Sequence, residues 1–409
     1  MTNFESDIVV MKFGGSSVGS EEGRARVSHH VKRELDLGNK VVLVVSALGR
    51  KPAPYATDTL LSLIDASEAP EHELDLIMSV GETISAVVCA DTLRRAGVDA
   101  RALSGHDAGI ATDSVDRAAT IESINTALIM DVLAAGVVPV ITGFQGMDSE
   151  GNLKTLGRGG SDTSACALGV ALGASHVDIY SDVDGVLSAD PRVVKDAQII
   201  DTISSGELFE MAKRGSKIVH APAAELALNS GVRMRVKNTF SDADGTLVTS
   251  FGSDTPRSIA TGVSCRRGVA RVRLIIPYGP GKPLKHIDVI ARAFRILADS
   301  EISIDMATPF TNRLVFIVDS KDAKRAAEVL SELSDDINIL DDLATVTLVG
   351  NGMQGVPGIM ADIAEALDES NVDVLQASDS ETSVTVLVRE DFADAAQNAL
   401  HKRFALQKK

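Results

Sequence analysis

Short apolar runs alternate with longer helical stretches from residue 8 to about residue 248, and this alternation constrains the fold most. Runs rich in β-branched residues are typical of buried strands, whereas apolar residues three or four positions apart are typical of amphipathic helices. The alternation predicts a three-layer α/β domain with a largely parallel sheet. The expected strands are Ile8–Phe13, Lys40–Val45, Ala100–Leu103, Val137–Thr142, Val177–Ser181 and Arg233–Lys237.

Three further segments complete the prediction for this domain. Long helices are expected at Leu74–Ala96 and Ala118–Ala135, and another helix is expected to begin near Ser20. The segment Phe240–Arg257 is rich in Ser, Asp, Gly and Thr, which is typical of a connection between domains.

An internal repeat follows the connection. ARVRLI at 270–275 matches ATVTLV at 344–349, and LVFIV at 314–318 matches VTVLV at 384–388. Each copy has the pattern strand, helix, strand, strand, helix, which predicts two ferredoxin-like modules of ~70 residues. A dimerisation scaffold that binds no ligand is the simplest alternative for them. The predicted parts are a first domain over 1–250, a connection over 251–264, and modules over 265–336 and 337–409.

Charge and cysteine content exclude several classes of protein. The net charge of −17 disfavours nucleic acid and anionic membranes as partners, since both attract cationic surfaces. Cys89, Cys166 and Cys265 lie far apart, so neither a disulfide framework nor a zinc site is expected. A cytoplasmic protein without a transmembrane segment or a metal held by its own side chains is therefore expected.

A glycine-rich turn follows the first expected strand, in the sequence KFGGSS. Gly14 and Gly15 are expected to form a tight turn with positive φ, and Lys12 adds a positive charge beside it. Backbone N–H groups of such a turn bind anions, so the turn predicts a phosphate site. Neither G-x-G-x-x-G nor the P-loop motif occurs in the chain, which disfavours dinucleotide enzymes and P-loop NTPases.

Two further loops are expected at the same edge of the sheet. In GRGGSD, Arg158 could grip a carboxylate or phosphate, and Ser161 or Asp162 could cap the following helix. The Asp-rich stretch at 180–192 follows a strand, where ligands of open α/β sheets bind. Together the loops predict a nucleotide phosphate on one side and a small anion on the other.

In this order and spacing, KFGGSS, VSALG, GET, TGFQG, TLGRGGSDTS, SDVDGV and ADPR resemble the aspartate kinase (aspartokinase) family of the amino-acid kinase superfamily. The doubled module resembles the pair of ACT regulatory domains of that family, and the resemblance covers residues 8 to 405. It implies a carbamate-kinase-like three-layer domain followed by two ferredoxin-like ACT domains. The stretch 46–61 is similar to the diaminopimelate-sensitive form of Gram-positive bacteria.

The resemblance also implies roles for individual residues. Catalytic roles are implied for Lys12, Asp162 and Lys217, with Asp162 orienting lysines near the transferred group. ATP contacts are implied for Lys12, Gly14, Gly15, Ser16, Ser161, Tyr180, Ser181, Val186, Leu187, Ser188, Ala189, Asp190, Pro191 and Lys217. Aspartate contacts are implied for Ser46, Thr57, Glu82, Phe144, Arg158, Gly159, Gly160 and Ser161. Glu82 would face the ammonium group of aspartate and Arg158 its α-carboxylate. Thr83 and Ala221 depart from the usual family pattern without removing a catalytic group.

The activity that the resemblance implies is transfer of the γ-phosphoryl group of ATP to the β-carboxylate of L-aspartate. This carboxylate is already ionised at neutral pH, so no general base is needed, and Mg²⁺ would be held mainly by phosphates and water. The ACT domains would form a homodimer or larger homo-oligomer and bind an inhibitory amino acid. We favour meso-diaminopimelate over lysine or threonine as this effector. The alternatives are a kinase for glutamate, N-acetylglutamate or UMP, and an amino-acid-binding regulator without catalysis.

Overall fold

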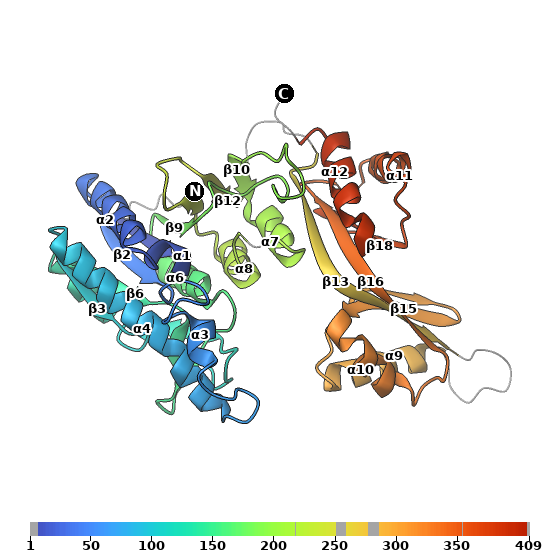
Figure 1. Cartoon of the computed structure of the whole chain (residues 1–409), viewed down its shortest axis with the longest axis horizontal. Coiled ribbons are helices and arrows are strands. Elements are labelled where there is room, and N and C mark those ends of the chain that lie inside the picture. Colours follow the sequence, from blue (N-terminus) through green and yellow to red (C-terminus); the bar gives the residue numbers. More distant parts are fainter. Residues whose placement is uncertain (1–6, 217, 251–258, 277–285, 354, 407–409) are drawn as a thin grey trace. The chain divides into compact units, whose positions relative to one another are not determined.

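The computed structural model describes residues 7–216, 218–250, 259–276, 286–353 and 355–406 (Figure 1). By its internal contacts the chain divides into two compact units. The first unit comprises Met1–Val186, Ile199–Lys213 and Lys217–Pro256, and the second comprises Leu187–Gln198, Arg214–Ser216 and Arg257–Lys409. The division after residue 256 lies close to the predicted connection. The two short segments that pack with the C-terminal part were not predicted.

An eight-stranded sheet forms the centre of the first unit. The strand order is β10-β12-β11-β9-β1-β2-β6-β3, and neighbouring strands pair in parallel except β11 with β12. The strands are β1 (Ile8–Phe13), β2 (Lys40–Val45), β3 (Ala100–Leu103), β6 (Val138–Thr142), β9 (His176–Ser181), β10 (Thr202–Ser204), β11 (Met234–Asn238) and β12 (Thr246–Thr249). All six predicted strands are confirmed to within one residue at each end. β12 lies in the segment that was expected to be only a connection.

Helices cover both faces of this sheet, which confirms the three-layer prediction. They are α1 (Gly15–Val18), α2 (Glu21–Asp36), α3 (Thr57–Leu61), α4 (Glu71–Arg95), α5 (Ala127–Ala134), α6 (Gly160–Ala171), α7 (Ser205–Lys213) and α8 (Ala221–Ser230). α2 and α4 pack on the face of β1 that carries Met11 and Phe13. Lys12 points to the opposite face, where it pairs with Asp162 of α6. Ser20 caps α2 as expected, since its Oγ accepts a hydrogen bond of 3.0 Å from the Gly23 N–H.

Helix α4 has 25 residues and a mean hydropathy of 1.5 over its most apolar window, enough to cross a membrane by length and composition alone. About half of that window is buried inside the first unit. The helix packs against β3, β6 and β8, and its buried face carries the carboxyl groups of Asp75 and Glu82. We therefore interpret α4 as a core helix of the domain.

The predicted helix Ala118–Ala135 is wrong in its first half. Ile121–Ile124 forms strand β5, and only Ala127–Ala134 is helical. β5 pairs antiparallel with β4 (Ile110–Thr112), which also pairs with β7 (Gln145–Met147), and β8 (Leu153–Thr155) completes a small four-stranded sheet. The partner for β5 comes from a separate part of the chain, so tertiary pairing overrides the local helical pattern.

The second unit contains a single six-stranded sheet with the order β14-β15-β13-β16-β18-β17. Its strands are β13 (Gly262–Ile275), β14 (Asp305–Phe310), β15 (Arg313–Asp319), β16 (Ile337–Val349), β17 (Gln376–Asp379) and β18 (Ser383–Arg389). Its α-helices are α9 (His286–Asp299), α10 (Ala323–Leu330), α11 (Ile359–Glu369) and α12 (Ala393–Arg403). Both copies therefore have the predicted β-α-β-β-α order, and the ferredoxin-like prediction is confirmed.

The two modules exchange halves of their longest strands. Gly262–Arg267 of β13 pairs with Ala344–Val349 of β16 in the second module, next to β18. The later half of β13 pairs with β15 and with the early half of β16 in the first module. Gly268 and Asp342 have positive φ at the register shifts between these halves. Figure 1 shows β13 and β16 side by side, with α9 and α10 toward one end and α11 and α12 toward the other. The predicted boundary at 336/337 thus separates the helices of the modules but not their strands.

Three aromatic rings form part of the core behind β1. Tyr180 is fully buried, and its ring stacks on Phe13 with centroids 4.3 Å apart. The His30 ring lies 4.7 Å from Tyr180, and its Nε2 donates a hydrogen bond of 2.9 Å to the Thr239 carbonyl oxygen. Burial lowers the pKa of His30 to about 4. The fold therefore favours the neutral form of this imidazole.

We expect His30 to make the first unit sensitive to acid. An unfolded histidine has a pKa of ~6.5, so the contribution of His30 to the free energy of unfolding is complete above that pH. This contribution falls as the pH drops toward 4. Between pH 6.5 and pH 5.0 it falls by about 2 kcal/mol, because the change is ~1.4 kcal/mol per pH unit. Guanidinium unfolding of wild type and His30→Gln, followed by circular dichroism, measures this difference.

His29→Gln is the matched control, because the side chain of His29 is 49% exposed and precedes His30 on α2. This variant should keep the wild-type pH dependence. If the free energy of unfolding depends on pH equally in wild type and His30→Gln, the assignment of this dependence to His30 is contradicted.

Candidate active site

The first glycine-rich loop follows β1 and brings Lys12 close to α6. Gly14 and Gly15 lack the positive φ that was expected, and Gly14 has φ −74°. The loop needs glycine for another reason, which is close approach. A Cβ on Gly15 would lie 2.4 Å from the Gly49 carbonyl oxygen and 2.9 Å from that of Ala47. Gly15 thus packs directly against the segment after β2, and Ser16 follows it as a half-buried residue of α1.

The second glycine-rich loop joins β8 to α6. The N-cap of α6 is Gly159, with φ +71°, so the predicted cap by Ser161 or Asp162 is wrong. Both residues lie inside the first turn instead. A Cβ on Gly159 would lie 2.0 Å from the His220 ring, which leaves no room for another residue there. Arg158 is exposed, and among the residues that the structure describes its side chain has no ion-pair partner.

A buried ion pair joins the two loops. Lys12 Nζ lies 2.5 Å from Asp162 Oδ1, and the exposed fractions of the two residues are 9% and 4%. The structure therefore brings together two of the three predicted catalytic residues. The third, Lys217, lies outside the described residues. Since Asp162 fixes its ammonium group, Lys12 is held at the carboxyl end of β1 before any ligand arrives.

Glu82 of α4 presents an unpaired oxygen in the same region. Its Oε1 accepts a hydrogen bond of 3.0 Å from the Ala47 N–H, directly after Ser46. Its Oε2 is buried and has no hydrogen-bond partner within the described part of the chain. Burial raises the pKa of Glu82 to about 8, although the charge on Lys12 opposes this shift. Burial favours the neutral form of this carboxyl group, and a cation bound beside it would stabilise the charged form.

The remaining residues predicted to bind aspartate lie on neighbouring loops. Phe144 has φ +72°, and its N–H donates a hydrogen bond of 3.0 Å to Ser164 Oγ. A Cβ on Gly160 would lie 2.9 Å from the Phe144 ring, so the loop after β6 packs on the start of α6. Ser161 is buried there, beside Gly143. Thr57 begins α3, which packs on α4. The Ala47 amide and the Ser164 hydroxyl were not predicted; both lie within the motifs VSALG and TLGRGGSDTS, but only the fold reveals their partners.

The residues predicted to bind nucleotide are divided between the two compact units. The Tyr180 side chain is a core residue, so its predicted contact with ATP is restricted to its backbone, where the carbonyl oxygen accepts a hydrogen bond of 3.4 Å from the Gly14 N–H. Ser181 ends β9 and Val186 belongs to the first unit, whereas Leu187–Gln198 belongs to the second. In this loop Ser188 and Ala189 are buried, Leu187 and Asp190 are half-buried and Pro191 is exposed.

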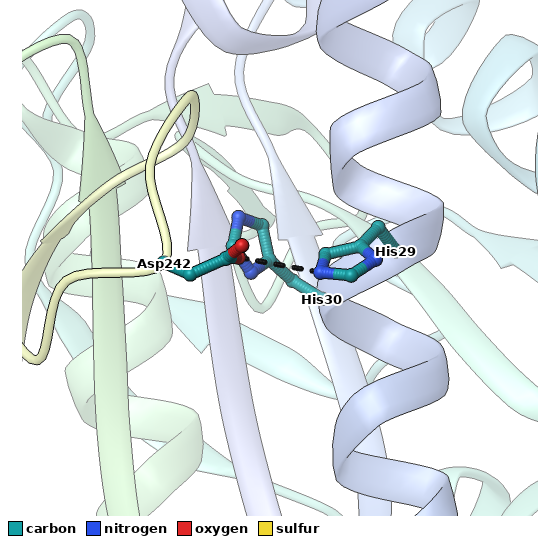
Figure 2. A group of neighbouring side chains, drawn as sticks. All are labelled: His29, His30 and Asp242. Carbon is teal, nitrogen blue, oxygen red and sulfur yellow. Dashed lines mark hydrogen bonds and ion pairs between the residues drawn. The ribbon is translucent and has the colours of Figure 1, made fainter.

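One cluster in the described residues has the composition of a metal site (Figure 2). His29 Nε2 lies 3.2 Å from Asp242 Oδ1, and the His30 ring lies beside them. Arg26 also donates a hydrogen bond of 2.8 Å to the same oxygen, and His30 Nε2 donates to the Thr239 carbonyl. Because the Arg26 guanidinium occupies Asp242 Oδ1 and His30 Nε2 is engaged by the backbone, we assign no metal to the cluster.

Comparison with known proteins places this geometry in a family. The amino acid kinase family profile matches residues 7–238, and an ACT domain profile matches residues 338–402. Aspartokinase 1 of Bacillus subtilis is 39% identical over 98% of this chain and 100% of its own length.

Solved structures agree with this match. E. coli aspartokinase III in complex with aspartate and ADP has the same fold, with a TM-score of 0.81, 24% identity, and coverage of 97% of this chain and 99% of that one. The same enzyme in complex with lysine and aspartate gives a TM-score of 0.72 at 25% identity, over 98% of this chain and 100% of that one. The chain therefore belongs to the aspartokinase family, with an amino acid kinase domain and ACT domains.

Proposed function

We propose that the chain transfers the γ-phosphoryl group of ATP to the β-carboxylate of L-aspartate, giving 4-phospho-L-aspartate. This product begins the route to lysine, diaminopimelate, threonine and methionine, and we propose that the reaction takes place in the cytoplasm. The observation that carries the proposal is that an acidic oxygen without a partner and a fixed cation lie in the same region of the first unit. Glu82 has a buried oxygen without a partner, and the Lys12–Asp162 pair provides a fixed cation.

Different residues of the chain would bind aspartate and the phosphate groups of ATP. Glu82 would receive the ammonium group of aspartate, and Arg158 would hold its α-carboxylate with a planar bidentate contact. Lys12, with the amides near Gly14 and Gly15, would bind phosphate and stabilise the charge that develops on it. ATP supplies the phosphoryl group, and Mg²⁺ would be held mainly by phosphates and water. The β-carboxylate is ionised at neutral pH, so the residues need only position it.

The proposal is tested by the choice of substrate. Release of ADP, together with trapping of the acyl phosphate by hydroxylamine, should depend on L-aspartate and not on glutamate, N-acetylglutamate or UMP. Lys12→Met should lower kcat by roughly 10²–10³, because one fixed electrostatic contact has about this effect on a transition state. Lys40→Met is the control, since this lysine is exposed at the start of β2. Turnover of another substrate in preference to aspartate would refute the proposal.

Glu82→Gln should separate binding from stability. Glutamine keeps the hydrogen bond from Ala47 but cannot carry the charge that attracts ammonium. The KM for aspartate should rise about 10- to 100-fold, since hydrogen bonds to charged groups contribute ~1.5–3 kcal/mol. The KM for ATP should change little.

The same variant should be more stable than wild type at alkaline pH. The pKa of Glu82 is raised in the fold, so the wild-type carboxyl group destabilises the folded state increasingly from about pH 4.5 to pH 8. Thermal unfolding at pH 5 and pH 8 measures this change. Glu73→Gln, at an exposed position of α4, should alter neither the KM for aspartate nor the stability difference between pH 5 and pH 8. An unchanged KM for aspartate would remove Glu82 from the binding site.

We propose that the second unit forms a homodimer or larger homo-oligomer and binds an inhibitory amino acid. A cavity of about 190 Å³ lies in the second module, lined by residues that include Gly358, Ile359, Asp379 and Ser380. It adjoins the start of α11, whose N–H groups suit a carboxylate, and Asp379 suits an ammonium group. The comparable positions of the first module are Met306–Pro309, which forms part of β14, and Lys282–Leu284, which lies outside the described residues.

Meso-diaminopimelate should inhibit the full-length chain at millimolar concentration, more strongly than lysine or threonine. Initial rates with each amino acid, alone and in pairs, measure this order. Asp379→Asn should raise the concentration for half inhibition about tenfold, whereas Glu381→Gln, at an exposed neighbouring position, should not. Inhibition that is identical in both variants would locate the effector elsewhere. No inhibition by any of the three would favour the scaffold alternative.

A further inference from the structure

Ser188 anchors the loop Leu187–Gln198 within the second unit. Its N–H donates a hydrogen bond of 2.8 Å to the Gln198 carbonyl, and the Gln198 N–H donates one of 2.9 Å to Ser188 Oγ. The Ser188 carbonyl accepts a hydrogen bond of 2.7 Å from the Val263 N–H of β13. Ser188 is 2% exposed. Its hydroxyl group is therefore turned into the second unit and is committed to protein contacts.

The side-chain partner of Ser188 is His401 of α12. Ser188 Oγ lies 2.9 Å from His401 Nε2, and His401 is 1% exposed. Because Ser188 Oγ already accepts a hydrogen bond from Gln198, its own proton can be donated to Nε2 of a neutral imidazole. Burial lowers the pKa of His401, which favours this neutral form. Asn398, one turn earlier on α12, donates a hydrogen bond of 3.3 Å to the Val193 carbonyl of the same loop.

The start of the loop is fixed independently. The Val186 N–H donates a hydrogen bond of 2.8 Å to Thr246 Oγ1, and the Val186 carbonyl accepts one of 2.8 Å from the Ile200 N–H. Val186 and Ile200 belong to the first unit, and Leu187–Gln198 belongs to the second. A single peptide bond thus joins a residue fixed in the first unit to a loop that is hydrogen-bonded to α12 in the second.

We propose that His401 is a positioning residue for the nucleotide, holding Ser188 so that Val186–Pro191 keeps the conformation that binds ATP. The inference rests on the proposed function of this loop in ATP binding. Without His401 the buried Ser188 hydroxyl loses a partner, and relief of that cost requires the loop to move. The ATP affinity of the kinase would then depend on a helix of the last ACT module, more than 200 residues further along the chain.

His401→Leu and Ser188→Ala in the full-length chain test the proposal. Each should weaken binding of Mg·ADP about five- to tenfold in titration calorimetry and raise the KM for ATP similarly, with the KM for aspartate changed less than twofold. The double variant should bind no more weakly than the weaker single variant, because both changes remove one shared hydrogen bond. His401→Gln, whose side-chain oxygen can accept the Ser188 proton, should retain most of the affinity.

Lys402→Ala is the matched control, since this side chain is exposed at the next position of α12. A Mg·ADP affinity within twofold of wild type in both single variants, additive losses in the double variant, or equal changes in both KM values would overturn the proposal. If His401→Leu does not fold, Ser188→Ala and His401→Gln decide the question. Wild type that binds Mg·ADP but does not phosphorylate aspartate would refute the proposed function alone, because the affinity measurements still test His401.

Discussion

The buried ion pair between Lys12 and Asp162 is the contact on which the candidate site depends. It joins the end of β1 to the first turn of α6, and so brings together two loops that are far apart in the sequence. Loss of one partner of such a pair leaves an uncompensated buried charge, at a cost of ~3–5 kcal/mol. The same contact holds the lysine ammonium group at the end of β1. The packing of the two loops and the position of this lysine are in this way properties of one interaction.

Glu82 differs from Asp162 in the partners of its carboxyl group. Its carboxyl group is as deeply buried as Asp162, yet one of its oxygens has no partner among the described residues. Burial without a partner disfavours the charged form of this group and raises its pKa. The two carboxyl groups therefore differ in their surroundings: Asp162 forms an ion pair with Lys12, whereas Glu82 has no ion-pair partner among the described residues.

Much of this arrangement could be predicted from the sequence, and the exceptions have clear physical causes. The central strands are continuous β-branched runs, so their position follows from the residues alone. The segment Ile121–Ile124 becomes a strand because a distant partner pairs with it, which no local pattern reveals. Gly15 was expected to have a positive φ, which it lacks, and the burial of the Tyr180 ring was not predicted. Close approach of the backbone requires the glycine, and core packing takes the tyrosine ring. The repeat identified the modules correctly but could not show that their strands cross over.

The crossed strands also determine the order in which the second unit can form during synthesis. Gly262 at the start of β13 pairs with Val349 at the end of β16, and the later half of β13 needs the early half of β16. A nascent chain that has produced only the first repeat therefore lacks one strand of that module's sheet, and an edge of β13 stays open. Neither repeat can close its sheet until the other has begun to emerge from the ribosome. The duplicated segment is consequently one folding unit, and neither copy could be lost without leaving the other incomplete.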